Sequence, residues 1–211
     1  MSIQLPPILD FNDQTNTGTL IDTRDGQSYP VVKIGKQIWL AENFRYLPSK
    51  DKGDLFDASC VYDNDNSYLE KGYGRLYDWN TAMSIAPEGW KLPSNEDHIE
   101  LRDFIIKDNN LTVNEVSSYL KSIEGWNTLT SSKDVVNIDK YGFNVKPAGY
   151  YNNSYNKGFF SNEGEDASFW SDTTKKDADY WFLSDSMKEY NYYHVTNNES
   201  IWLSVRLIKD I

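Results

Sequence analysis

The stretch GFNVKPAGYYN, residues 142–152, lies where the hydrophobic pattern of the chain changes. Before it, apolar residues recur every three or four positions, as Leu101, Phe104 and Ile105 do, and this spacing predicts helices. After it, short aromatic runs alternate with Asn- and Gly-rich turns, a pattern typical of strands. Helices followed by a block of strands indicate an α+β fold.

Working outward toward the N-terminus, the sequence predicts three helices. The clearest begins after Ser94 and runs to about Lys107, because Ser94 and Asp97 have the spacing of a capping box. A helix over 75–86 presents a stripe of apolar residues and ends at the Pro-Glu-Gly that follows. A third is predicted over 112–121, where Thr and Glu again have capping-box spacing.

Strands are predicted on both sides of these helices. Residues 1–18, with two prolines and a polar run, are expected to be a tail or linker, and residues 19–211 to be a single domain. Residues 47–74 are expected to be a long connection rich in turn residues. The predicted strands are 20–22, 29–34, 37–40, 149–151, 159–160, 168–170, 180–183, 190–195 and 201–208.

Composition excludes several classes of protein. The 211 residues carry a net charge of −11, which disfavours nucleic acid as a partner, because phosphate binding needs clustered Lys and Arg. With 15 Tyr, 9 Phe and 7 Trp, most of the chain is too aromatic to be disordered. No apolar run approaches the roughly 20 residues that span a bilayer, so membrane insertion is not expected.

Few residues suited to catalysis are present. The chain has one cysteine, Cys60, and two histidines, His98 and His194, which excludes a multi-cysteine zinc site. No base lies beside Cys60 in the sequence, so a structural role is expected for it. His98 is expected to pack on or under its helix. No nucleophile elbow, P-loop or dinucleotide fingerprint occurs, so neither enzyme activity nor a cofactor is expected.

The run Asp63-Asn64-Asp65-Asn66 resembles part of a calcium loop. An EF-hand needs Gly at its sixth position and Glu at its twelfth, where this chain has Tyr68 and Gly74. Two interpretations stay open: an oxygen-ligand metal site that includes Asp63 and Asp65, or ordinary turn chemistry.

Two clusters combine Tyr with Asn. They belong to the predicted late strands, and recognition surfaces favour this composition because Tyr gives rigid contact area and Asn adaptable hydrogen bonds. The alternative is that Tyr merely suits strands and Asn turns. The candidate ligand-binding residues are Tyr150, Tyr151, Asn152, Asn153, Tyr155, Tyr190, Tyr192, Tyr193, His194 and Asn197.

Six blocks occur in an order that resembles a known family. They are DTRDGQSYPVVKIGKQIWLAENFRY (22–46), YGRLYDWNTAM (73–83), PEGWKLPS (87–94), GFNVKPAGYYN (142–152), FWSDT (169–173) and SVRLIKD (204–210). Together they resemble the Fibrobacter succinogenes major paralogous domain over about residues 19–210. The resemblance implies a C-type lectin-like fold, with helices flanking a twisted antiparallel sheet, paired N- and C-terminal strands, and ligand loops that emerge from the later strands.

This resemblance favours a non-catalytic recognition module that binds a glycan or a protein. Such a module is expected at the cell surface if an export signal has been removed. A second hypothesis is a structural or receptor-binding exterior part of a phage particle or contractile injection system, assembled in the cytoplasm as a homo-oligomer or with an assembly partner. An enzyme with an unrecognised site is the third. The calcium tripeptides of C-type lectins (EPN, QPD, WND) are absent, so the lectin mechanism does not follow from the fold.

Overall fold

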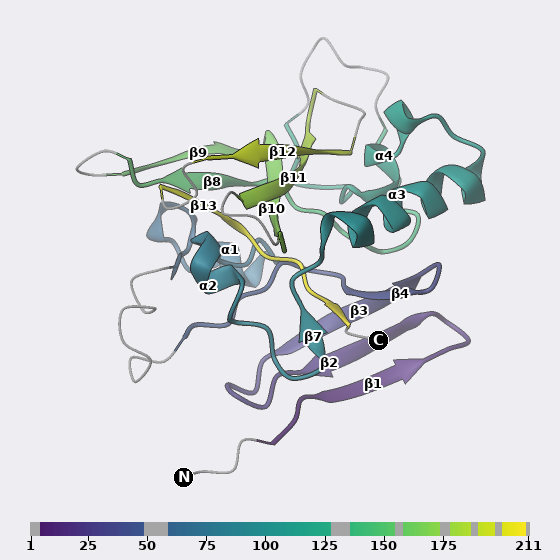
Figure 1. Ribbon diagram of the computed structural model, residues 1–211, viewed down its shortest axis with the longest axis horizontal. Coiled ribbons are helices and arrows are strands. Elements are labelled where there is room, and N and C mark those ends of the chain that lie inside the picture. The colour runs from purple at the N-terminus through teal and green to yellow at the C-terminus, as the bar shows by residue number, and fades with distance from the viewer. Residues whose placement is uncertain are drawn as a thin grey trace.

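The computed structural model describes residues 5–48, 59–127, 136–154, 158–173, 178–186, 190–196 and 200–209. It is an α+β protein with two sheets (Figure 1). No helix within the described ranges is long and apolar enough to span a membrane.

The first sheet has six strands in the order β1-β2-β3-β4-β14-β7 and forms the lower layer of Figure 1. Its neighbouring strands are antiparallel. The C-terminal strand β14 therefore joins the N-terminal meander through β4, not through β1. The strands are β1 (Ile8–Asn12), β2 (Thr17–Ile21), β3 (Ser28–Ile34), β4 (Gln37–Leu40), β7 (Trp90–Lys91) and β14 (Ile208–Lys209).

The second sheet forms the upper layer and is mixed. Its order is β12-β11-β10-β8-β13-β6-β5, and β9 pairs with β8 as a hairpin. β10 runs parallel to β8 and β13. The strands are β5 (Ser59–Cys60), β6 (Leu76–Tyr77), β8 (Ala148–Asn152), β9 (Phe159–Glu163), β10 (Asp166–Ser171), β11 (Ala178–Ser184), β12 (Asn191–Val195) and β13 (Ile201–Ser204).

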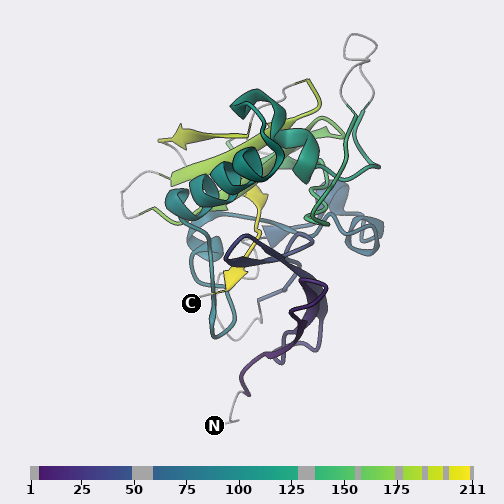
Figure 2. The same ribbon diagram turned by 90° about the vertical axis from the view of Figure 1, so that its right-hand side faces the viewer.

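One long helix packs on the second sheet. In Figure 2 it crosses one face of the late strands. Its capping box is present: Ser94 accepts from the Asp97 backbone N–H at 3.1 Å, and Asp97 accepts from the Ser94 N–H at 2.9 Å, as predicted. The helical segments are η2 (Tyr62–Asn64), α1 (Ser67–Glu70), α2 (Trp79–Ala82), α3 (Asn95–Asn109), η3 (Val113–Glu115) and α4 (Ser117–Leu120).

The core has two parts, separated by the second sheet. One lies between this sheet and α3 and contains Trp39, Leu101 and Trp181. The other lies on the opposite face, toward α2, and contains Trp170 and Leu203. The meander contributes residues to both parts. Successive strand residues point to opposite faces, so each central strand contributes to both parts.

The prediction of a tail at residues 1–18 is wrong. Residues 8–12 and 17–21 form the β1–β2 hairpin. The polar run between them is its turn: the Asn12 side chain accepts from the Gln14 backbone N–H at 2.9 Å, and Asn16 has a positive φ of 57°. Asn is one of the residues that tolerate this conformation, so turn chemistry explains the composition.

The prediction of a helix over 75–86 is also largely wrong. Leu76 and Tyr77 pair with β13 as a strand, and Asp78 caps a single helical turn by accepting from the Thr81 backbone N–H at 2.9 Å. Met83, expected in the apolar stripe, is 38% exposed. The predicted 112–121 helix is likewise two short turns, η3 and α4.

The C-terminal segment predicted as one strand, 201–208, changes sheets. Its first four residues form β13 in the second sheet, and Ile208 begins β14 in the first. Between them Arg206 is fully buried. Its Nη1 donates to the carbonyls of Leu40 (3.2 Å) and Phe143 (2.5 Å), and its Nη2 donates to the Asn43 amide oxygen at 2.7 Å. At the point where the chain changes sheets, this guanidinium joins the end of β4 to the segments around Asn43 and Phe143.

Candidate binding surface

Strand alternation divides the first Tyr/Asn cluster between two faces of the second sheet. In β8, Tyr150 and Asn152 line one pocket, while Tyr151 lines another. Since side chains two residues apart share a face, these consecutive residues do not form one surface. Asn153, beyond the strand, is exposed. Tyr155 lies outside the described residues.

The Tyr150 pocket lies on the face that also carries Trp170, and we call it the open-face pocket. Its volume is about 290 Å³, near the lower end for small-molecule sites. Five strands, β8, β9, β10, β11 and β13, contribute residues to it. Its lining residues are Tyr150, Asn152, Asn162, Asp166, Ser168, Tyr180, Phe182, Ile201 and Leu203.

Gly149 sets the position of Tyr150. It has a φ of +61°, and a Cβ there would lie 2.2 Å from the Ser161 carbonyl oxygen. Only glycine allows β9 to approach β8 this closely while β8 adopts this conformation. The approach brings Asn162, itself at a positive φ of 64°, into the lining of the same pocket.

Polar groups of the open-face pocket are ordered by one another. The Asn162 amide donates to the Asp166 carboxylate. Burial raises the pKa of Asp166, and it also raises the pKa of Tyr180, helped by the nearby Tyr193, Asp166 and Tyr150. The phenol of Tyr180 is therefore neutral at physiological pH and able both to donate and to accept hydrogen bonds.

The second Tyr cluster is divided in the same way. Tyr193 pairs with Tyr180 across the β11–β12 ladder and stacks on it, with ring centroids 5.8 Å apart and planes at 26°. It is 43% exposed and extends the aromatic surface beside the pocket. Tyr192, 50% exposed, points to the α3 face, where its ring lies 5.6 Å from Trp181.

Tyr190 does not belong to any binding surface. It is fully buried, and its hydroxyl shares a 2.5 Å hydrogen bond with Nδ1 of His98. His98 is itself buried between Trp39 and Trp181, with ring centroids 5.2 and 4.9 Å away. Burial lowers the pKa of His98 to about 3. The packing role predicted for His98 is confirmed, and the ligand role predicted for Tyr190 is wrong.

His194 has a carboxylate partner that sequence spacing does not reveal. It pairs in register with Asp179 on β11, and its Nδ1 lies 2.7 Å from Asp179 Oδ1. The other oxygen of Asp179 accepts from the Asn95 amide at 2.6 Å. This group faces α3, away from the open-face pocket. Asn197 lies outside the described residues.

Asp63 and Asp65, the candidate metal ligands, both lie in turns. Asp65 accepts from the backbone N–H and the hydroxyl of Ser67, both at 2.9 Å, and Asp63 occupies a left-handed turn with φ 50°. Across the described ranges, no group of three or more metal-ligating His, Cys, Asp or Glu side chains is found.

On the opposite face of β8 and β13 lies a second pocket of about 330 Å³, which we call the Arg75 pocket. Cys60 is one of its lining residues, and burial raises the pKa of this thiol to about 12. The described residues that line it are Leu47, Ser59, Cys60, Asn64, Arg75, Tyr151, Phe160 and Trp202.

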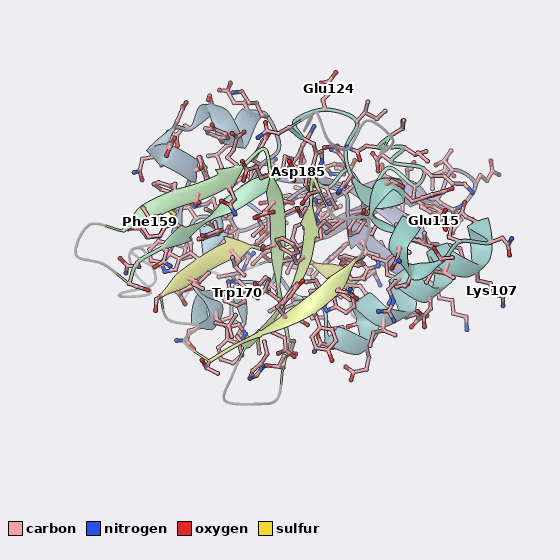
Figure 3. All side chains as sticks on the ribbon, turned by 90° about the horizontal axis from the view of Figure 1, so that it is seen from above. Lys107, Glu115, Glu124, Phe159, Trp170 and Asp185 are labelled. Carbon is pink, nitrogen blue, oxygen red and sulfur yellow. The ribbon has the colours of Figure 1, made fainter. Side chains whose placement is uncertain are left out.

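Several surface residues were missed by sequence reasoning. Tyr180 and Phe182 lie in a predicted strand, but nothing local distinguishes them from core residues. Asp166 and Asn162 join the pocket through the β8–β10 pairing and the β9 turn. Only knowledge of strand order identifies them. In Figure 3, which looks from above onto the late strands, Phe159 at the start of β9 lies on the opposite side of the molecule from Lys107 on α3.

The model of the Fibrobacter succinogenes major domain family matches residues 32–209. The chain belongs to this family. Its matched region begins within β3, so the β1–β2 hairpin precedes it, and it includes every residue of both pockets. No curated protein and no solved structure matches the chain.

Proposed function

We propose that this Fibrobacter succinogenes major domain is a non-catalytic recognition module that binds neutral glycans at the open-face pocket. The supporting observation is the convergence of Tyr150, Asn152 and Tyr180 with a carboxylate, Asp166, in one half-exposed pocket. Aromatic rings offer flat area for the C–H face of a sugar, while amide and carboxylate groups hydrogen-bond to its hydroxyls.

The charge of the pocket favours a neutral ligand. Asp166 is the one charged side chain among the described residues that line it, and its pKa is raised by burial. A ligand that donates hydroxyl hydrogen bonds to this carboxylate suits the pocket, whereas an anionic ligand would be repelled by it. Stacked Tyr193 beside the pocket adds area for a second sugar unit.

We also propose that the fold is of the C-type lectin-like type. The support is the return of the C-terminal strand β14 to the N-terminal meander through β4, with the helices and late strands inserted between them. In that arrangement the late strands β8 to β13 carry the ligand surface, which is where the open-face pocket lies.

A glycan-array screen of the purified chain tests the function, run in calcium and in EDTA. We expect binding to a neutral glycan, and at least tenfold weaker binding by Asp166→Asn, which keeps the shape but loses the acceptor charge. A matched control is Asp172→Asn, which lies outside the pocket lining and should bind as the natural chain does. If the chain bound no glycan but did bind a protein, the proposal would be overturned in favour of a protein-binding module.

A further inference from the structure

The Arg75 pocket differs in charge from the rest of this acidic protein. Among the described residues that line it, none is Asp or Glu and Arg75 is the one cation, although the chain as a whole has a net charge of −11. Across the part of the chain that the structure describes, no carboxylate lies within ion-pair distance of the Arg75 guanidinium.

Contacts along one edge of the Arg75 guanidinium hold this side chain in place. Its Nε donates to the Ser59 hydroxyl at 3.2 Å, and its Nη2 lies 3.5 Å from the Ser59 carbonyl oxygen. Both contacts go to neutral groups of β5, so they orient the guanidinium without neutralising it. A planar guanidinium that is fixed in this way suits a carboxylate, which it binds through two parallel hydrogen bonds.

The walls beside Arg75 are aromatic. The Tyr151 ring lies 4.8 Å from Phe160 and 5.0 Å from Trp202, at interplanar angles of 48° and 56°. These tilted rings form a concave apolar wall rather than a flat stack. At about 330 Å³, the pocket has room for one ring-sized group, not for a long chain.

We propose that the Arg75 pocket binds a carboxylate carried on a six-membered ring, of the kind found in a uronic acid. The carboxylate pairs with Arg75, the ring packs on Tyr151 and Trp202, and the hydroxyls reach Asn64 and Ser59. This site lies on the face of β8 and β13 opposite the open-face pocket, so the molecule has two ligand pockets of different charge preference. The proposal does not depend on neutral glycan binding.

The test is a titration followed by NMR on the ¹⁵N-labelled full chain. The probes are sodium glucuronate, glucose, benzoate and sodium chloride, and the signal is the indole N–H of Trp202, assigned by comparison with Trp202→Phe. We expect saturable shifts with glucuronate and none with glucose or chloride. Benzoate distinguishes the source of the carboxylate: stronger binding of glucuronate supports a sugar acid, and stronger binding of benzoate overturns it in favour of an aromatic acid.

Variants decide whether Arg75 is responsible. Arg75→Gln should weaken glucuronate binding at least tenfold. Arg75→Lys should give an intermediate loss, because it keeps the charge but cannot form the two parallel hydrogen bonds of a guanidinium. The control Arg102→Gln, on α3 outside the pocket lining, should leave binding unchanged. If Arg75→Gln does not fold, Arg75→Lys carries the comparison. Equal shifts with glucose, or unchanged affinity in the folded Arg75 variants, would overturn the proposal. Asp166→Asn should leave glucuronate binding intact, which separates this site from the open-face pocket.

Discussion

The buried His98 makes the stability of the protein depend on pH. Its ordinary pKa of 6.5 is lowered to about 3 by burial, so the folded protein keeps it neutral while the unfolded chain binds a proton below pH 6.5. Because the unfolded state then holds more protons, stability falls as the pH falls between 6.5 and 3, and is unaffected by this group above that range.

The size of the effect follows from the pKa difference. Each pH unit below 6.5 costs about 1.4 kcal/mol, so lowering the pH from 7 to 5 should reduce the free energy of unfolding by about 2 kcal/mol. That is a large share of the stability of an ordinary domain. Most surface carboxylates stay ionised over this interval, which makes pH 5 to 7 the window for the measurement.

The assay is urea denaturation at several pH values, for the natural chain and for His98→Phe. The variant keeps an aromatic ring between Trp39 and Trp181 but loses the hydrogen bond with Tyr190, so its stability is offset at every pH. The test compares how steeply the free energy of unfolding changes with pH in the two proteins, because His194 and all carboxylates are common to both. We expect the natural chain to lose about 2 kcal/mol more than the variant between pH 7 and 5. Parallel profiles would refute the reasoning.

Two further predictions concern buried groups. Arg206→Met should lower the free energy of unfolding by about 3 kcal/mol or more in chemical denaturation, because it leaves the carbonyls of Leu40 and Phe143 without their buried donor; a change below about 1 kcal/mol would contradict the joining role of Arg206. Cys60, whose pKa is raised to about 12 from 9.0, should react with iodoacetamide at pH 8 about 1,000-fold more slowly than in the urea-unfolded chain; equal rates would show that the thiol is not buried.

Local patterns were sufficient for the fold class and for several elements. Capping-box spacing located the start of α3 at Ser94, because the signal needs only four consecutive residues. Period-two alternation located the late strands. The same alternation predicts that Tyr150 and Tyr151 point to opposite faces of the sheet, and therefore that they line two different pockets.

Other features depend on contacts between distant segments. Asp179 meets His194, and Tyr180 meets Tyr193, only because β11 and β12 pair in one particular register. The segment 201–208 reads as one continuous strand, yet it leaves one sheet and enters the other around Arg206. These contacts and the change of sheet are determined by which strands pair, and not by the strand propensity of each segment. No single stretch of the sequence therefore predicts them.

The most direct test of the open-face pocket uses two neighbouring tyrosines of β12. Tyr193→Ala removes the ring stacked on Tyr180 beside the pocket, while Tyr192→Ala removes a ring of similar exposure from the opposite face. The measurement is the Kd of each variant for the glycan that binds the natural chain most tightly, with stability checked by urea denaturation. We expect about 30-fold weaker binding for Tyr193→Ala, equivalent to roughly 2 kcal/mol, and no change for Tyr192→Ala. Equal affinities for the two variants, or a loss confined to Tyr192→Ala, would contradict the assignment of the ligand surface to this face.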